Sequence, residues 1–258
     1  MDYEKESRMF NQMADYYDTY RPSYPDDIIE AIIQKTKLSA GSKLLEIGSG
    51  SGKATEQFTG NGFEILCIEP GVDLVKKGIE KFKDKNIEFT VSRFEDFCAP
   101  SGYFDTIFSA QAFHWVPQPA GYEKCAQILK KDGFLALFWN IEISYDTDFD
   151  KKFMTILNKY CGFVSTMQEA DYQKRPETII AGIAGSDLFK EPEMIQSHWD
   201  KQYTADEYYG YLLTGNVFVQ NPDEEKQACC EEIKQLASDY NGIFKRHYIC
   251  ELYLTQKK

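Results

Sequence analysis

The sequence predicts an α/β fold with a doubly wound, mostly parallel sheet, and three observations lead to this prediction. Short apolar runs alternate with segments of helical periodicity along the first 140 residues. Each run is apolar nearly throughout, which is typical of strands buried on both faces. A glycine-rich turn follows the first run, where open parallel sheets bind their ligands. We expect a seven-stranded sheet with an antiparallel edge strand.

The individual elements follow a regular order. Apolar strands are predicted at residues 43–47, 63–69, 87–91, 104–110 and 133–140. Between them, apolar residues recur every three or four positions, which predicts helices at 26–37, from Ala54 onward, at 72–82 and at 122–129. Strands that alternate with helices in this way form a parallel sheet with helices on both faces.

After Asn140 the rhythm changes. Helices are predicted at 150–160, 205–213 and 222–240, and residues 244–255 alternate as a closing antiparallel strand at or near an edge. Residues 193–203 are the candidate partner of that strand. We expect one domain over residues 1–258, with an aromatic arm at 1–25 and a helical insertion near 145–190.

Composition and charge narrow the function classes. The chain is 43% hydrophobic and 15% aromatic, enough for a buried core. Its formal net charge of -12 argues against nucleic acid as a partner, since such binding depends on Lys and Arg neutralising phosphates.

The same sequence argues for a cytoplasmic protein. It holds no run of about 18 apolar residues, so no membrane span is predicted. Residues 1–10 are charged where a secretory signal is apolar, so we expect the protein in the cytoplasm. The seven cysteines form no Cys-x-x-Cys pair, which indicates reduced, buried thiols rather than a metal site.

The glycine-rich turn, residues 46–52, reads Glu-Ile-Gly-Ser-Gly-Ser-Gly between a predicted strand and a predicted helix. A phosphate-binding Walker A loop fits the pair Gly52-Lys53 but not Ile47 or Ala54. A dinucleotide fingerprint requires a third glycine where Lys53 stands. A glycine turn without a ligand is a further alternative.

The turn matches a third type of ligand-binding motif at every position. The turn resembles the first motif of class I S-adenosylmethionine-dependent methyltransferases, which is an acidic residue, one spacer and Gly-x-Gly-x-Gly. The resemblance implies a Rossmann-like methyltransferase fold and S-adenosyl-L-methionine as cofactor, with the turn facing its methionine part and Glu46 near its ammonium. The implied contacts in the turn are Glu46, Gly48, Ser49, Gly50 and Gly52.

Two later segments extend this predicted cofactor site. Glu69 ends the second strand, where an acid accepts hydrogen bonds from ribose hydroxyls, and Pro70 follows it. Residues 92–97 resemble the adenine segment of the same family, although Arg93 stands where an Asp is frequent. We therefore expect the adenine contact at Phe94 and Glu95.

Residues 109–116, Ser-Ala-Gln-Ala-Phe-His-Trp-Val, resemble a small-molecule subgroup that includes trans-aconitate methyltransferase-like and UbiE-like proteins. The resemblance implies that Ser109, Ala110 and Gln111 meet the methionine part of the cofactor. It also implies that His114 and Trp115 lie close to the transferred methyl. His114 is then a candidate catalytic or substrate-orienting residue, with a purely structural histidine as the alternative.

The arm resembles the lid of the same subgroup, through Phe10, Asn11 and the run that ends in Arg-Pro-Ser-Tyr-Pro at 21–25. Tyr17 and Tyr20 are expected to close over the cofactor. Arg21 is expected to contact a carboxylate of the cofactor or of the substrate. An aromatic arm that simply packs on the sheet is the alternative.

Together these features predict transfer of a methyl group from S-adenosylmethionine to a small-molecule acceptor, a carboxylate or a hydroxyl. A carboxylate requires no base, whereas a hydroxyl requires one, and His114 is the best candidate base. Two alternatives remain, a methyltransferase acting on RNA or protein and a catalytically silent binding protein.

Overall fold

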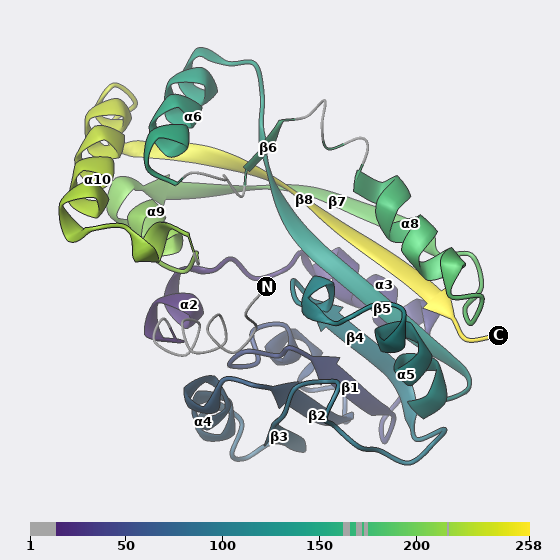
Figure 1. The fold of residues 1–258 in the computed structure, drawn as a ribbon. Coiled ribbons are helices and arrows are strands. Elements are labelled where there is room, and N and C mark those ends of the chain that lie inside the picture. The colour runs from purple at the N-terminus through teal and green to yellow at the C-terminus, as the bar shows by residue number, and fades with distance from the viewer. Residues whose placement is uncertain (1–13, 162–165, 169–171, 173–174, 216) are drawn as a thin grey trace.

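One twisted sheet runs through the computed structural model, which describes residues 14–161, 166–168, 172, 175–215 and 217–258. Its strands follow the order β3-β2-β1-β4-β5-β8-β7 (Figure 1). The strands are β1 (Lys43–Ile47), β2 (Glu64–Glu69), β3 (Ile87–Val91), β4 (Phe104–Ala110), β5 (Leu129–Ser144), β7 (Glu193–Thr204) and β8 (Ile243–Gln256). A short β6 (Thr166–Gln168) pairs with the far end of β5.

The strands from β3 to β5 pair in parallel, and β8 and β7 are added antiparallel. The predicted mostly parallel sheet with an antiparallel edge is therefore confirmed, as is the predicted pairing of 193–203 with the closing strand. The strand order reverses between β1 and β4, and open sheets bind ligands at that point.

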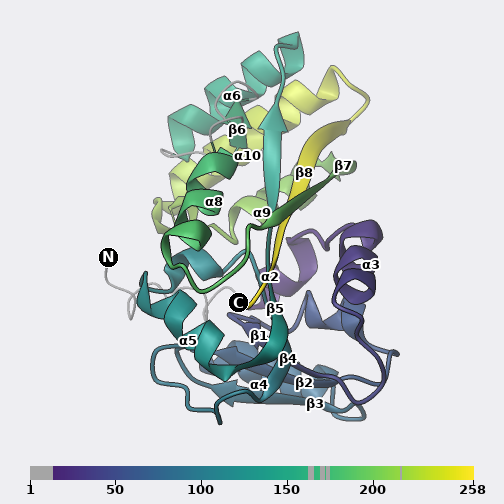
Figure 2. The ribbon, with the colours of Figure 1, turned by 90° about the vertical axis from the view of Figure 1, so that its right-hand side faces the viewer.

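Helices cover both faces of the sheet (Figure 2). The α-helices are α2 (Ala14–Tyr20), α3 (Asp26–Lys35), α4 (Val72–Lys81), α5 (Ala120–Ile128), α6 (Asp148–Tyr160), α8 (Arg175–Gly185), α9 (Ala205–Leu212) and α10 (Asp223–Ser238). Apolar residues of α3 pack on one face, and those of α5 and α8 pack on the other. None of the described helices is both long and apolar enough to cross a membrane.

The segment after the glycine turn differs from the prediction. Instead of a helix from Ala54, the chain forms one short 3-10 turn, η1 (Thr55–Phe58). Gly60 and Gly62 follow at φ values of +88° and +74°, outside the helical region, so the segment ends before a longer helix can form.

Strand β5 is longer than predicted, and its far half forms a ribbon with β8 and β7 beyond the parallel strands (Figure 1). Side chains alternate along the ribbon. Asn140 and Glu142 point to the face covered by α6, α9 and α10, which we call the α9 face. Trp139 and Ile141 belong to the core on the opposite side, which we call the α8 face.

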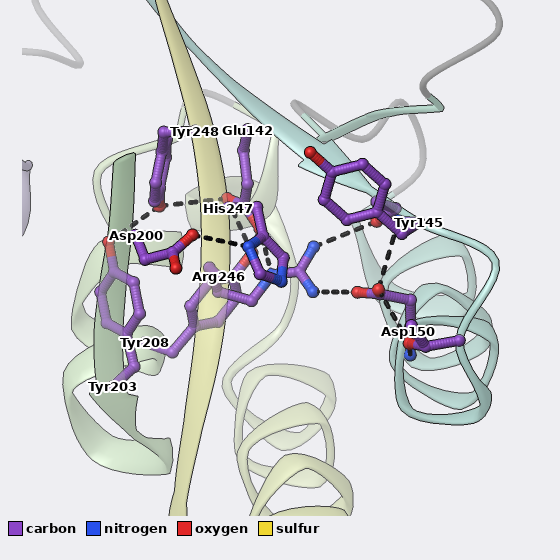
Figure 3. A network of polar contacts seen from close by, with 11 residues as sticks. Glu142, Tyr145, Asp150, Asp200, Tyr203, Tyr208, Arg246, His247 and Tyr248 are labelled. Carbon is purple, nitrogen blue, oxygen red and sulfur yellow. Dashed lines mark hydrogen bonds and ion pairs between the residues drawn. The ribbon is translucent and has the colours of Figure 1, made fainter. Parts of the chain in front are cut away.

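A buried arginine holds the α9 face together (Figure 3). Arg246 is fully buried, and its Nε donates to Glu142 Oε1 at 2.6 Å. Its Nη1 donates to Asp150, and its Nη2 donates to Ser144 Oγ at 3.0 Å. Tyr208 donates a further hydrogen bond to Glu142 at 3.0 Å. All three guanidinium nitrogens of Arg246 are thus engaged with side chains of the ribbon and α6.

Six of the seven cysteines are buried and Cys98 is exposed, with all seven thiols free. The predicted burial is therefore confirmed for six cysteines and is wrong for Cys98.

Candidate functional site

The glycine turn connects β1 to η1, and packing requires glycine at two of its positions. Gly48 has φ +68°, and a Cβ there would collide with the Cβ of Ala112, in the loop after β4. Gly52 has φ +85°, and a Cβ there would collide with the ring of Phe82. These close approaches fix the path of the turn beside the carboxyl ends of β1 and β4.

Glu69, at the end of β2, lies against this turn. Only 8% exposed, it accepts hydrogen bonds from the backbone N–H of Gly50 at 3.1 Å and of Gly71 at 2.8 Å. Its carboxylate is therefore anchored beside the turn, with Pro70 next to it in the chain. This is the place at which a ribose contact is predicted.

Glu46 is a buried acid without a cationic partner among the described residues. It is 1% exposed, and the hydroxyl of Thr55 donates a hydrogen bond to it. Burial raises the pKa of Glu46 to about 8, and the nearby negative charge of Glu69 adds to the increase. At neutral pH this carboxyl is mostly protonated, and a cation placed beside it would favour its ionised form.

Glu46 and Arg21 line the same pocket, whose empty volume is about 370 Å³ including the part open to solvent. The other lining residues are Tyr17, Pro22, Tyr24, Gly48, Ser49, Lys53, Ala54, Ala110 and Gln111. An acid and a guanidinium in one small pocket match the ammonium and the carboxylate of an amino-acid group. The pocket thus offers one partner for each charge of an amino-acid group.

The described part of the arm packs over this pocket. Arg21 Nε donates to Thr214 Oγ1 at 2.7 Å, and the guanidinium lies 5.4 Å from the ring centre of Tyr17 and 5.1 Å from that of Tyr211. Tyr20 packs against Gly210 of α9. Phe10 and Asn11 of the predicted lid lie outside the described residues.

The arm also touches the glycine turn directly. Asp18 Oδ1 accepts a hydrogen bond from Ser51 Oγ at 2.8 Å, and Lys81 Nζ lies 3.7 Å from the same oxygen. The arm is therefore fixed to both α9 and the turn.

The end of β4 supplies the next predicted contacts. Ser109 is fully buried, and its hydroxyl donates to the backbone oxygen of Ile47 at 2.8 Å, so its side chain ties β4 to β1. Ala110 and Gln111 line the pocket. Gln111 has φ +62°, and its side chain donates to the backbone oxygen of Asn140 at 2.9 Å.

Phe94 and Glu95, the predicted adenine contacts, are both held by the rest of the protein. Phe94 is 4% exposed and belongs to the apolar core. Lys124 Nζ donates to the backbone oxygen of Phe94 at 2.7 Å and to that of Glu95 at 2.9 Å. The ring of Phe94 thus serves packing, and an adenine contact at Phe94 and Glu95 stays a prediction.

His114 lies in a short 3-10 turn, η2 (Phe113–Trp115), where its ring centre is 5.0 Å from that of Trp115. Its Nδ1 accepts a hydrogen bond from Trp139 Nε1 at 3.4 Å. An indole N–H can only donate, so the neutral imidazole carries its proton on Nε2.

The protonation of His114 follows from its surroundings. Although the residue is exposed to solvent, crowding by protein atoms lowers the pKa of its imidazole, and the charge of Arg175 lowers it further. At neutral pH His114 is therefore uncharged and a weak base. This state favours its predicted orienting role over its predicted role as a base.

The predicted catalytic residues do not form one cluster. Tyr20 and Arg21 lie toward α9, with Arg21 lining the pocket. His114 instead contacts Trp139, whose side chain lies on the α8 face.

Asn140 and Arg175, which the sequence analysis did not select, make hydrogen bonds near the site. Asn140 Nδ2 donates to the backbone oxygen of Ser23 at 3.0 Å, and its Oδ1 accepts from Trp199 Nε1 at 3.3 Å. Asn140 therefore connects the arm to the ribbon. Arg175 Nε donates to Glu251 Oε1 at 2.6 Å. No motif signals Arg175, because its partner lies 76 residues further along the chain.

Comparison with known proteins identifies a methyltransferase family over part of the chain. Residues 45–137 match the family described as Methyltransferase domain. An uncharacterized methyltransferase of Schizosaccharomyces pombe is 30% identical over 126 residues, which are 48% of this chain and 49% of the relative. A Saccharomyces cerevisiae protein described as a probable S-adenosylmethionine-dependent methyltransferase is 31% identical over 133 residues, 49% of this chain and 45% of the relative. The chain spans about half the length of the curated relatives that it matches.

Solved structures resemble the fold over most of the chain. The YcgJ protein of Bacillus subtilis gives a TM-score of 0.56 at 15% identity, covering 90% of this chain and 98% of that chain. A Haemonchus contortus phosphoethanolamine N-methyltransferase solved with S-adenosylhomocysteine also gives 0.56, at 12% identity, covering 96% of this chain and 57% of that chain.

Proposed function

Because the chain carries a class I methyltransferase domain whose cofactor is S-adenosylmethionine, we propose that it transfers a methyl group from this cofactor to a small-molecule acceptor. One observation carries the proposal. Glu46 and Arg21 line one pocket beside the glycine turn and supply a partner for each charge of an amino-acid group.

The residues around the pocket have separable tasks. Bound S-adenosylmethionine supplies a methyl group on a sulfonium, which a nucleophile can displace. Glu46 and Arg21 hold its amino-acid end, and Glu69 accepts hydrogen bonds from its ribose. The arm, fixed to the turn through Asp18 and Ser51, covers the pocket and excludes water. Catalysis then depends on alignment, which needs no metal or triad.

The state of His114 favours a carboxylate as the acceptor group. A carboxylate oxygen attacks the methyl carbon, the new O–CH₃ bond forms and the S–CH₃ bond breaks. The two opposite charges cancel, and no proton has to move. Because His114 is uncharged and weakly basic, it suits this reaction better than the deprotonation of a hydroxyl. The segment at 109–116, which resembles the small-molecule subgroup, supports a small-molecule acceptor.

Thermal unfolding in the presence of four ligands tests which cofactor the protein binds, and hence the basis of the proposal. A ligand present at about 100 times its Kd adds roughly 2.7 kcal/mol, which raises Tm by about 5–10 °C. We expect this increase with S-adenosylmethionine and S-adenosylhomocysteine and none with NAD or ATP. An increase with NAD or ATP alone would overturn the proposal.

Release of S-adenosylhomocysteine then tests the acceptor. Succinate, malonate and benzoate should support release, and the matched amides should not. Turnover of the amides alone would contradict a carboxylate acceptor.

A further inference from the structure

Arg21 is assigned to the cofactor, so an anionic acceptor requires a second cationic group near the site. Arg175, the first residue of α8, is such a group on the α8 face. Its guanidinium carbon lies 5.3 Å from the ring centre of Trp139, the residue that hydrogen-bonds His114. His114 in turn lies three residues after Gln111, which lines the cofactor pocket. Arg175 and His114 thus both contact Trp139, and His114 is close in sequence to the pocket-lining Gln111.

The guanidinium of Arg175 has unused donors. Its side chain is 24% exposed, and its Nε donates to Glu251 Oε1 at 2.6 Å. Within the described part of the chain, Nη1 and Nη2 donate no hydrogen bond. Two parallel N–H donors of a guanidinium match the two oxygens of a carboxylate.

Glu251 holds Arg175 in this orientation. It is fully buried, and its second oxygen accepts a hydrogen bond from the hydroxyl of Tyr172 at 3.1 Å. The guanidinium also lies over the aromatic ring of Trp139, a cation–π contact. The base of the guanidinium is therefore fixed while its terminal nitrogens stay available.

His114 adds a donor of the same kind. Its Nδ1 is occupied by Trp139, so its neutral ring presents Nε2–H, which has no described partner. A neutral N–H donor and a guanidinium both favour oxygen anions over cations or apolar groups.

We propose that Arg175 and His114 form an anion subsite that binds a carboxylate of the methyl acceptor, with Glu251 as the positioning residue. The subsite rests on the proposed function, since it deepens the assignment of the acceptor. Arg175 supplies the paired donors and His114 supplies a single donor, and both residues contact Trp139 on the α8 face.

Malonate, with malonamide as its uncharged analogue, is the probe for this subsite. Titration calorimetry on the protein saturated with S-adenosylhomocysteine should show that malonate binds and malonamide does not. Arg175→Met should weaken malonate binding by about tenfold or more, because hydrogen bonds to charged groups are lost. Arg175→Lys should recover part of the affinity, since it keeps the charge without the paired donors.

The controls separate binding from folding. Arg175→Met leaves Glu251 buried and unpaired, so the double variant Arg175→Met/Glu251→Gln removes both charges and should also lose malonate binding. Lys151→Met makes the same charge change on the exposed surface of α6, where Lys151 pairs with Asp146, and should bind malonate normally.

Two results would overturn the subsite. One is a wild-type protein that binds S-adenosylhomocysteine but not malonate, and the other is unchanged malonate affinity in both Arg175 variants. A protein that fails to bind S-adenosylhomocysteine would contradict the proposed function instead, so the two failures can be told apart.

Discussion

Two arginine–glutamate pairs lie on opposite faces of the β5–β8 ribbon. On the α9 face, Arg246 is fully buried and all three of its nitrogens donate to Glu142, Asp150 and Ser144 (Figure 3). On the α8 face, Arg175 is 24% exposed, and among the described residues it donates only through Nε, to Glu251.

The difference shows how the same residue type serves structure or ligand binding. A guanidinium whose nitrogens are all engaged by the protein can bind nothing else, and its role is to neutralise buried acids. A guanidinium held by one nitrogen keeps its paired terminal donors for a ligand. Two single variants and two double variants measure whether the two pairs differ in this way.

The largest effect is expected from Arg246→Met. The substitution leaves Glu142 and Asp150 buried without their cation, which costs about 3–5 kcal/mol when one partner of a buried pair is removed. The free energy of unfolding, measured by urea denaturation, should fall by that amount. A loss below about 1 kcal/mol would show that water or rearrangement compensates these acids.

A smaller effect is expected from Arg175→Met, about 1–3 kcal/mol, because only Glu251 is left without its charged partner. The double variant Arg175→Met/Glu251→Gln should recover most of this loss. Arg246→Met/Glu142→Gln should not recover, since Asp150 stays unpaired. Equal recovery in both double variants of the urea experiment would remove the distinction between the two faces.

The sequence predicts the parallel strands and the antiparallel pairing of 193–203 with 244–255 well, and the side-chain pairs of the ribbon poorly, for a physical reason. The parallel strands are marked by apolar runs, and the glycine turn by steric needs at Gly48 and Gly52 that only glycine meets. These signals are local. The pairs Arg246–Glu142 and Arg175–Glu251 join residues 104 and 76 positions apart, and no local pattern marks such partners.

Two further differences between the sequence-based predictions and the structure also have physical causes. The helix expected from Ala54 is a short 3-10 turn because Gly60 and Gly62 follow so soon. The charge state of His114 could not be predicted either, since it depends on Trp139 and on Arg175, which only the folded chain brings close.

Glu46 sharpens the comparison as a buried glutamate that forms no ion pair with an arginine among the described residues. Its pKa, raised to about 8 by burial, means that the carboxyl is mostly protonated at pH 7. Because a cofactor ammonium pairs with the ionised form, the contribution of Glu46 to affinity should be nearly full about one unit above its pKa and should be lost as pH falls through the pKa. Between pH 8.5 and pH 7, we expect the Kd of S-adenosylhomocysteine to rise roughly tenfold, equivalent to about 1.4 kcal/mol.

Titration calorimetry across this pH range, in buffers of different ionisation enthalpy, measures both the Kd and the proton released on binding. Glu46→Gln should bind S-adenosylhomocysteine more weakly and with no such pH dependence, since its amide does not titrate in this range. A wild-type Kd that stays constant from pH 7 to pH 8.5 would mean that Glu46 does not ionise when the cofactor binds. Glu46 would then only accept the hydrogen bond from Thr55 and would not bind the cofactor ammonium. The assignment of Glu46 and Arg21 as a site for an amino-acid group would then lack its partner for the ammonium.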